Sequence, residues 1–542
     1  MAKKFIAAIV MTALMSACSA DPKSSEIEEN ENISSDMPEE DTLGAEEDSV
    51  PASAIKKPLT LSMRIPRDFN PLLNENESVD SVLKLIFEPL VTLDASLKPI
   101  GGLARSFDFA QDGLSVRVAL REDAVWSDGS PITSQDVKYS LNVIKSAPES
   151  SLYKECAKNV KSCDVVDDST VNITFDNVYG SQAYRLRFPV IPRHYYENMK
   201  KAISAEPVLP IGCGMYVMES YSVAKGAGLV VNELYFERKP EIRNINVIVA
   251  DSETSLYAFN SGVIDCVDAS MAELARISVG EANIVEYTNG FYEFIGFNFG
   301  SAVFSDARVR RAVALSVDID EIIETAYLSQ AKRAMSPISP ESWLYEPNVV
   351  KLKPDIKQAA TLLDEAGFKT PDAGGARTRQ TAAGETRLSF DILVNEENIE
   401  RLKIAQTLSD SLKKLNIETS IVSKPFFEYE DMIESGQYDL LAGGFIAPDF
   451  PDFAFAFSGE ENIFRYKSAE MDEHISRIEN AVNESVLKSA ASEFQNFFAQ
   501  ELVCVSLAFR ESALIADKRI LGDLRAARGA PYANVNEWRL DE

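Results

Sequence analysis

The side chains that usually carry out chemistry in enzymes and metal sites are scarce in this sequence. Only two histidines, His194 and His474, occur in 542 residues. Serine hydrolases carry the nucleophile in G-x-S-x-G, and zinc peptidases carry their ligands in H-E-x-x-H; the sequence contains neither pattern. No cysteine and histidine form a convincing nucleophile and base. The sequence therefore argues against a secreted hydrolase, and we expect no catalytic residue, no cofactor and no resident metal.

A glycine-rich segment, PIGCGMY at residues 210–216, is the remaining place where chemistry could be sought. A phosphate-binding loop would continue with lysine and then serine or threonine, and this segment does not. Glycines in such a position more often let one stretch of backbone pass close to a neighbouring strand. We therefore interpret the segment as structural.

The N-terminus has the three parts of an export signal. Lys3 and Lys4 precede an apolar run at residues 5–15, and two small residues precede Cys18. Such a run is too short to span a bilayer and is typical of a cleaved signal peptide. The small-small-Cys ending resembles a bacterial lipobox, which implies that Cys18 is acylated and becomes the first mature residue. The alternative is an ordinary cleavage site with Cys18 beyond it, and both place the mature protein outside the cytosol.

The residues after Cys18 predict a tether. Residues 19–54 contain 12 carboxylates, one lysine and no aromatic residue, and they account for about 11 of the 30 excess negative charges. Such a segment cannot bury enough apolar surface to fold, and its like charges extend it. We place the disordered tether at residues 19–56. The strong negative charge also argues against nucleic acid and against anionic lipid headgroups as partners, since both require clustered cations.

Beyond the tether, about 485 residues of ordinary apolar content predict several core-forming units. The segments mix strands and helices. A strand is expected at 59–65, a helix at 79–87 and a hairpin at 102–120 around Asp112-Gly113. Thr133 and Asp136 are spaced as a capping pair for a helix at 134–144. Among five further cysteines, Cys156 and Cys163 are close enough in sequence to pair; the others, Cys213, Cys266 and Cys504, are expected to be buried thiols.

Several recognisable motifs follow one another in a fixed order along the chain. The most recognisable is WSDGSPIT at residues 126–133, which is also interpretable as a strand-turn-helix junction with Trp126 packed beneath it. Others are FPVIPRHYYE from Phe188, PIGCGMYVMESY from Pro210, AFNSGVIDCVD from Ala258, FIGFN from Phe294, FSDARVRRAVALSVD from Phe304, LLDEAGF from Leu362 and YDLLAGGFIAPDFPD from Tyr438. Together they cover nearly the whole mature chain. In this order they resemble the motifs of one family, the extracellular solute-binding proteins of peptide and nickel ABC importers.

The resemblance implies a mixed α/β, two-lobed fold like that of periplasmic binding proteins, with the ligand in a cleft between the lobes. Mapped onto this sequence, lobe I comprises residues 57–92, 205–290 and 500–542, and residues 93–204 form a subdomain inserted in it. Residues 291–499 form lobe II. The resemblance also implies an importer permease as partner, a monomeric protein, and membrane attachment through the lipid alone.

For the ligand, the resemblance implies a peptide added as an extra strand, with an acidic residue after a Gly-aromatic strand pairing with its amino group. The matching strand contains Gly444, Phe445 and Ile446, and Asp449 is the first candidate for the acidic residue. Pro448 occupies the usual place of that aspartate, so Asp452 is a second candidate. Either aspartate could instead cap the following turn.

The resemblance places further ligand contacts on the other lobe and in the cleft wall. Glu75, Asn76 and Glu77 follow the Asn-Pro turn of lobe I, and Tyr153 and Tyr292 lie in stretches that can line the cleft, although a core role is as well supported. Nickel and haem carriers share the family, so a metal chelate is the alternative ligand. A lipoprotein receptor that senses peptides would use the same binding chemistry.

Overall fold

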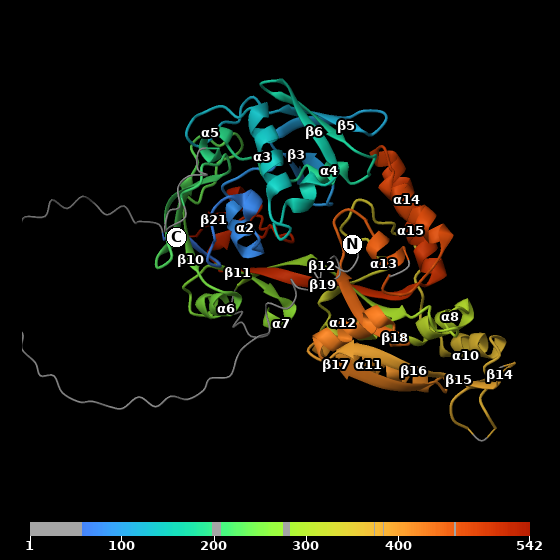
Figure 1. Cartoon of the computed structure of the whole chain (residues 1–542). Helices are drawn as coiled ribbons and strands as arrows, with labels where there is room; N and C mark the ends of the chain where they lie inside the picture. The colour runs from blue at the N-terminus through green and yellow to red at the C-terminus, as the bar shows by residue number, and fades with distance from the viewer. Residues whose placement is uncertain are drawn as a thin grey trace, which may run out of the picture.

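A computed structural model describes residues 57–197, 208–274, 282–372, 374–382, 384–459 and 462–541. The predicted signal peptide, Cys18 and the acidic tether lie outside these residues. The described chain is a mixed α/β protein with two lobes, as the sequence predicts (Figure 1). None of its described helices has both the length and the apolar character that crossing a membrane requires.

The first lobe is built on a four-stranded sheet with the order β1-β10-β9-β8, in which only β1 and β10 are parallel. The strands are β1 Leu59–Met63, β8 Tyr216–Ser222, β9 Gly226–Val231 and β10 Asn244–Val249. The helices are η1 Pro71–Leu73, α2 Glu77–Leu83, α6 Ser252–Asn260 and α7 Met271–Leu274. Helix α2 begins earlier than the predicted Val79 because the Asn76 side chain accepts hydrogen bonds from the amides of Ser78 and Val79.

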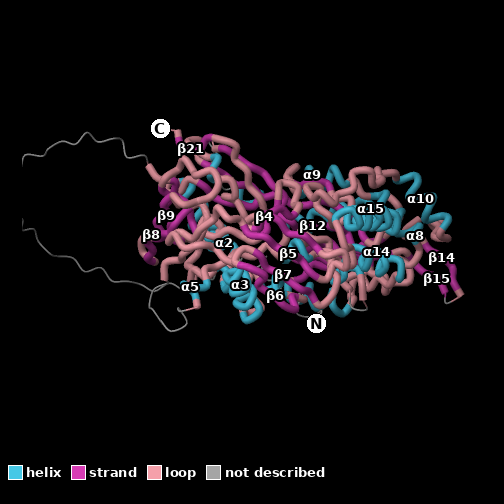
Figure 2. Tube along the Cα trace, turned by 90° about the horizontal axis from the view of Figure 1, so that it is seen from above, coloured by secondary structure: helices cyan, strands magenta, loops and turns pink. Residues whose placement is uncertain are grey.

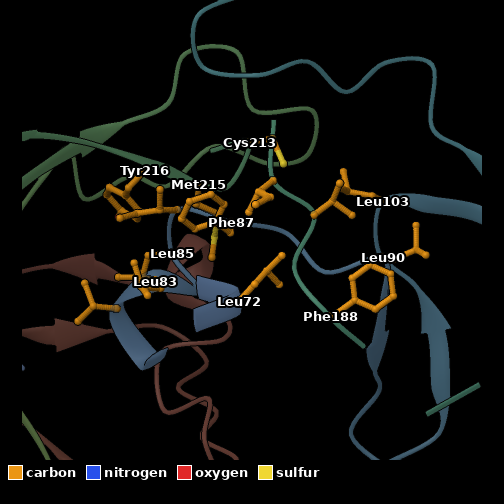
Figure 3. Packing of buried hydrophobic residues seen from close by; sticks show 14 of the residues in the cluster. Leu72, Leu83, Leu85, Phe87, Leu90, Leu103, Phe188, Cys213, Met215 and Tyr216 are labelled. Atoms are coloured by element: carbon orange, nitrogen blue, oxygen red, sulfur yellow. The ribbon is translucent and has the colours of Figure 1, made fainter. Parts of the chain in front are cut away.

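The core of this lobe joins segments that are far apart in the sequence. Figure 3 shows Leu72 and Phe87 packed near Phe188, Cys213 and Tyr216, and all five side chains are buried. The same cluster contains buried side chains of the segment between Phe87 and Phe188, among them Val118 and Trp126. One apolar core is therefore shared by the first lobe and the subdomain inserted in it.

The glycine-rich segment makes the predicted close approach. A Cβ atom on Gly212 would lie 2.0 Å from the carbonyl oxygen of Ile86, and one on Gly214 would lie 2.7 Å from the carbonyl carbon. The amide of Gly214 donates to the same carbonyl oxygen at 2.7 Å. The structural interpretation is confirmed, although the neighbour is the turn after α2 rather than a strand.

The subdomain contains a second four-stranded antiparallel sheet, with the order β4-β5-β7-β6 and with α3 packed on β6. Its strands are β4 Ala104–Phe109, β5 Ser115–Leu120, β6 Val160–Asp167 and β7 Thr170–Phe175. The other elements are β2 Val91–Leu93, β3 Pro99–Gly101, α3 Ser134–Ser146, η2 Lys154–Ala157, α4 Gln182–Arg185 and α5 Arg193–Tyr196. The predicted hairpin is confirmed as β4 and β5, with Gly113 in the turn at φ +66°.

The WSDGSPIT motif forms the predicted junction. Trp126 is fully buried, and Gly129 adopts φ +85° in the turn that follows. The carboxylate of Asp136 accepts hydrogen bonds from the backbone N–H of Thr133 at 2.8 Å and from its hydroxyl at 2.9 Å, which starts α3. The motif therefore forms a strand-turn-helix junction of the subdomain, which confirms the structural interpretation.

The second lobe surrounds a larger sheet with the order β11-β19-β12-β18-β16-β17, and β13 pairs with β19. The strands are β11 Cys266–Ser270, β12 Asn283–Phe297, β13 Ala331–Arg333, β16 Ser389–Asn395, β17 Glu418–Lys424, β18 Leu440–Ile446 and β19 Cys504–Ala516. The helices are α8 Ala307–Ser316, α9 Ile319–Ala326, α10 Ile356–Glu365, α11 Ile399–Lys413, α12 Phe426–Ser435, α13 Ala454–Phe457, α14 Ala469–Glu479 and α15 Glu484–Glu501.

Three short pieces complete the described elements: the hairpin β14 Thr378–Thr381 and β15 Gly384–Arg387, the pair β20 Ile520–Leu521 and β21 Arg539–Leu540, and η4 Val535–Glu537. Figure 2 shows the hairpin of β14 and β15 at the end of this lobe that lies farthest from β8 and β9.

Two long antiparallel strands, β12 and β19, run through both lobes. Residues 283–288 pair with 511–516, and the pairing resumes from Tyr292, opposite Phe509, after a register shift between Thr288 and Tyr292. Gly290 lies inside this irregular stretch with φ +83°. Apolar side chains that precede the shift on β12, and those that follow residue 512 on β19, pack with lobe I. Apolar side chains at the opposite ends of the two strands pack with lobe II. From this packing we propose that the lobes divide near residue 290 on β12 and near residue 510 on β19, where the register shift lies.

The described cysteines are all free thiols, so Cys156 and Cys163 do not form the disulfide that their spacing allows. Cys156 lies in η2 and Cys163 in β6, and burial raises the pKa of each thiol to about 11. Both are therefore unreactive at neutral pH. The prediction that Cys213, Cys266 and Cys504 are buried thiols is confirmed.

Glu88, which follows α2, makes the stability of this protein depend on pH. Burial raises the pKa of Glu88 to about 7, and the negative charge of Glu237 contributes to the increase. A hydrogen bond that the Tyr235 hydroxyl donates at 3.1 Å and the positive charge of Arg121 both act to lower this pKa, but they do not offset the burial. The folded state therefore holds this proton above pH 4.5, so stability is lost as the pH rises through 7. We expect Glu88→Gln to stabilise the protein by about 2 kcal/mol at pH 8 and hardly at all at pH 4.5.

Thermal unfolding at the two pH values measures this effect. The matched control is Glu122→Gln in the same lobe, because Glu122 is exposed and pairs with Arg105 at the surface. Two results would contradict the raised pKa of Glu88. One is that Glu122→Gln increases the stability at pH 8 as much as Glu88→Gln does, and the other is that Glu88→Gln increases the stability equally at both pH values.

Candidate functional site

Asp449, the first candidate for binding an amino group, lies just beyond β18 where the second lobe meets the inserted subdomain. Its Oδ2 atom accepts a hydrogen bond from Nη1 of Arg187 at 2.5 Å, which makes an ion pair between the two bodies. Arg187 falls within residues 93–204, which the sequence predicts to form the inserted subdomain. The described residues donate no hydrogen bond to the other oxygen, Oδ1.

The charge of Asp449 is fixed by its neighbours. Burial alone would raise the pKa of Asp449, but Arg187, Arg528 and a hydrogen bond from Arg187 hold it below its ordinary value. The carboxylate is therefore ionised at neutral pH. It is suited to pair with a second cation through the oxygen that Arg187 leaves open.

Asp452, the second candidate, is also in contact with the subdomain. Its Oδ2 atom accepts a hydrogen bond from the Tyr179 hydroxyl at 2.7 Å. The next helix, α13, has Phe453 at its N-cap and no side-chain cap hydrogen bond. Both aspartates thus lie at the contact between the lobes, and Asp449 alone pairs there with a cation.

The same contact continues through aromatic and backbone groups. Phe450 packs against Tyr179 and Tyr184, with ring centroids 6.2 and 5.5 Å apart. Trp343 of the second lobe donates from Nε1 to the Tyr184 hydroxyl at 2.9 Å, and the Gly180 amide donates to the Glu479 carbonyl at 2.5 Å. Figure 1 shows α14 of the second lobe reaching the subdomain near β5. The structure is therefore in a closed arrangement.

Strand β18 leaves one edge open just before Asp449. It pairs with β12 over residues 440–446, but with β16 only at Leu440 and Leu441. The described chain places no strand beside Gly444, Phe445 and Ile446 on that second edge. Unpaired backbone groups on a strand edge are what an added peptide strand requires.

Two of the predicted aromatic contacts belong to the core of the second lobe. Tyr292 is completely buried, its hydroxyl lies 2.6 Å from the Ser506 hydroxyl, and its ring packs against Phe445 and Phe509. Phe445 is also buried. In this conformation the side chains of Tyr292 and Phe445 present no surface to a ligand, so only the backbone of Phe445 remains available.

The predicted residues of lobe I lie at the start of α2. Asn76 is its N-cap, while Glu75 and Glu77 are exposed. Tyr153 is buried and donates its hydroxyl to Asp80 of α2 at 3.0 Å, and Asp80 pairs with Lys84 at 2.6 Å. Asn76 and Tyr153 thus have structural partners.

The comparisons with known proteins agree with this geometry. Residues 98–462, about two thirds of the chain, match the family described as bacterial extracellular solute-binding proteins, family 5 middle. The chain belongs to this family. It is therefore an ABC transporter substrate-binding protein of the peptide/nickel type.

Relatives of this family 5 protein are distant in sequence. The oligopeptide-binding protein AppA of Bacillus subtilis is 23% identical over 459 residues, which cover 80% of this chain and 82% of AppA. The solved structure of AppA in complex with a nonapeptide has a TM-score of 0.59 at 20% identity, covering 90% of this chain and 100% of that one. The structure of a nickel ABC transporter from Bacillus halodurans has a TM-score of 0.75 at 18% identity, covering 89% and 99%. These likenesses confirm the two-lobed fold.

Sequence reasoning missed the cations of the site. Arg187 immediately precedes the FPVIPRHYYE motif, and this position next to a family motif was the one feature of the sequence that could have indicated its role. Lys84 and Arg528 lie in segments without any motif, and only the folded chain brings them to the site.

A buried charge cluster supports the strands behind Asp449. Glu293 of β12 is fully buried, and its carboxylate pairs with Arg401 of α11 at 2.9 Å and with Arg510 of β19 at 2.7 Å. Glu293 lies opposite Gly444 of β18 in the sheet register. A Cβ atom on Gly444 would lie 2.7 Å from Nη2 of Arg401, so this glycine gives the cluster its space.

The two histidines lie apart. Nε2 of His194 lies 2.8 Å from Oδ2 of Asp128 in the WSDGSPIT turn, and the His474 ring packs on Phe497 with centroids 4.7 Å apart. In the described ranges, histidine, cysteine, aspartate and glutamate nowhere gather into a group of three or more that could hold a metal ion.

Proposed function

We propose that this family 5 protein is a monomeric lipoprotein, anchored through Cys18 outside the cytosol, that captures oligopeptides or dipeptides between its lobes for an importer permease. The observation that carries the proposal is the open edge of β18 leading directly to the ionised Asp449. A strand edge binds any peptide backbone. The carboxylate then sets the register by pairing with the ligand's amino terminus.

The contacts of Asp449 support this role. Arg187 occupies Oδ2 only, so Oδ1 is left for an ammonium group. Closing the lobes lowers the local dielectric, and a charge pair is worth more there than at an open surface. Closure around a ligand is also the movement by which such proteins signal the loaded state.

Native mass spectrometry of the purified protein with a mixed library of short peptides tests the proposal. We expect retention of peptides with free amino termini and loss of binding when the terminus is acetylated. Absence of any bound peptide contradicts the proposal. Uptake of peptide by cells that lack this protein separates an importer component from a sensor, because only the importer's loss abolishes uptake.

Replacing Asp449 with asparagine is expected to weaken peptides with free amino termini at least tenfold, because it removes the charge that pairs with the ammonium group. The matched control is Asp452→Asn, which changes the same group three residues away and leaves Asp449 intact. We expect less than a threefold change for the control. Calorimetric titration of one peptide into both variants provides the measurement, and an equal response rejects Asp449 as the anchor.

A metal chelate is the second candidate ligand, because the nickel ABC transporter structure from Bacillus halodurans matches this fold with a TM-score of 0.75. A chelate brings its own donor atoms, so it can be held without protein imidazole groups. Titration with nickel, alone and with free histidine, distinguishes the candidates. Tight nickel uptake in the absence of peptide binding favours the chelate.

A further inference from the structure

Four segments that are distant in sequence converge on the backbone before Asp449. Nζ of Lys84, at the end of α2, donates to the Gly529 carbonyl at 2.6 Å. The neighbouring Arg528 donates from Nη1 to the Ala447 carbonyl at 3.2 Å. The C-terminal loop thus connects α2 of the first lobe to the end of β18 in the second.

Arg528 also lies over the crossover between the lobes. A Cβ atom on Gly290 would lie 2.6 Å from its Nη1 atom. The Ala447 amide donates to the Gly290 carbonyl at 2.9 Å, which ties the end of β18 to the irregular stretch of β12. The guanidinium therefore lies at the meeting point of both lobes and of the proposed ligand strand.

The charges at this place do not balance. Lys84 pairs with Asp80 at 2.6 Å and Arg187 pairs with Asp449 at 2.5 Å. Arg528 is exposed, and within the described residues its one hydrogen bond goes to a carbonyl. Its charge acts on Asp449, but none of the described carboxylates forms a direct ion pair with it. One cation is thus in excess at the site of a chain whose formal net charge is −30. An exposed guanidinium without a direct carboxylate partner, at the contact between the lobes, is suited to receive a carboxylate in two parallel hydrogen bonds.

We propose that Arg528 determines specificity by binding a carboxylate of the ligand, which rests on the proposed capture of peptides at Asp449. Arg528 contacts the carbonyl of Ala447, which lies two residues before Asp449, so the two backbone positions are at most roughly 7 Å apart. A ligand that spans them carries its carboxylate within one or two residues of its amino group. The carboxylate is either the C-terminus of a dipeptide or an acidic side chain near the N-terminus of a longer peptide.

Two pairs of probes separate these sources in calorimetric titrations. Ala-Ala against Ala-Ala-amide tests the terminal carboxylate, and Ala-Glu-Ala-amide against Ala-Gln-Ala-amide tests the side chain. We expect the wild-type protein to prefer the carboxylate member of at least one pair by about tenfold or more. Arg528→Gln should abolish that preference while changing the affinity for the neutral member by less than twofold.

Arg525→Gln is the matched control, since Arg525 lies in the same loop but pairs with Asp523 and Glu537 at the surface. It should keep the wild-type preference, and both variants should melt at the wild-type temperature because the two arginines are exposed. Equal affinity within both pairs, or a preference that survives Arg528→Gln, overturns this inference and leaves the proposed function intact. Failure of all four probes to bind contradicts the proposed function and this inference together.

Discussion

Replacing Glu293 with glutamine is expected to lower the free energy of unfolding by about 3–5 kcal/mol, because it leaves two buried arginines without their counter-charge. Glu293 is fully buried, and the side chain of Arg401 is only 12% exposed. Burial alone would raise the pKa of Glu293, but Arg401 and Arg510 hold it below its ordinary value of 4.5. The cluster is therefore charged throughout the neutral range, and neither arginine can release its proton to relieve the imbalance.

The cluster also gives this variant a distinct pH dependence. A carboxylate with a lowered pKa stabilises the folded state above its ordinary pKa, and that stabilisation is lost as the pH falls below about 4.5. The wild-type protein should therefore lose its advantage over Glu293→Gln in acid. Chemical unfolding followed by tryptophan fluorescence at pH 7 and pH 3.5 provides the measurement.

The matched control for this experiment is Glu418→Gln in β17. Glu418 belongs to the same sheet, but it and its partner Arg387 are half exposed. Exposed pairs contribute at most about 1 kcal/mol, so the control should unfold almost as the wild type does. A loss for Glu293→Gln no larger than that of the control would show that the cluster does not stabilise the second lobe.

Local features of this fold were predictable from the sequence because their causes are local. The junction from Trp126 to Asp136 needs a glycine turn and a capping pair within eleven residues, and the sequence shows both. The glycine-rich segment at 210–216 likewise predicts a close approach between two stretches of backbone. Its partner, Ile86, could not be predicted, since the two segments are more than 120 residues apart.

The candidate site shows where such prediction ends. Asp449 follows a recognisable strand, but its partner Arg187 is 262 residues away, and no spacing rule joins the two. Tyr292 lies in an alternating strand whose two faces are both covered, so the sequence could not decide between cleft and core. The crossover strands β12 and β19 each serve two lobes, so no local pattern in the sequence marks where the lobes divide.

Reversing the charge of Arg187 is expected to open the closed arrangement. In Arg187→Glu the introduced carboxylate would face Asp449 where a 2.5 Å ion pair now stands, and like charges in a partly buried contact cost several kcal/mol. The remaining contacts, such as the hydrogen bond from Tyr179 to Asp452, contribute about 1 kcal/mol each. The closed form should become the minor state, and small-angle X-ray scattering should record a larger radius of gyration.

The double variant Arg187→Glu with Asp449→Arg is the decisive control, because it restores an ion pair with the charges exchanged. We expect it to recover the compact radius of gyration but not the peptide affinity, since the carboxylate then stands on the subdomain and no longer at the end of β18. Recovery of both properties would mean that the ligand needs a carboxylate between the lobes but does not need it at the end of β18. Recovery of neither would mean that the ion pair does not hold the lobes together. Closure and ligand anchoring are thus separable, because Arg187 uses one oxygen of Asp449 and leaves the other to the ligand.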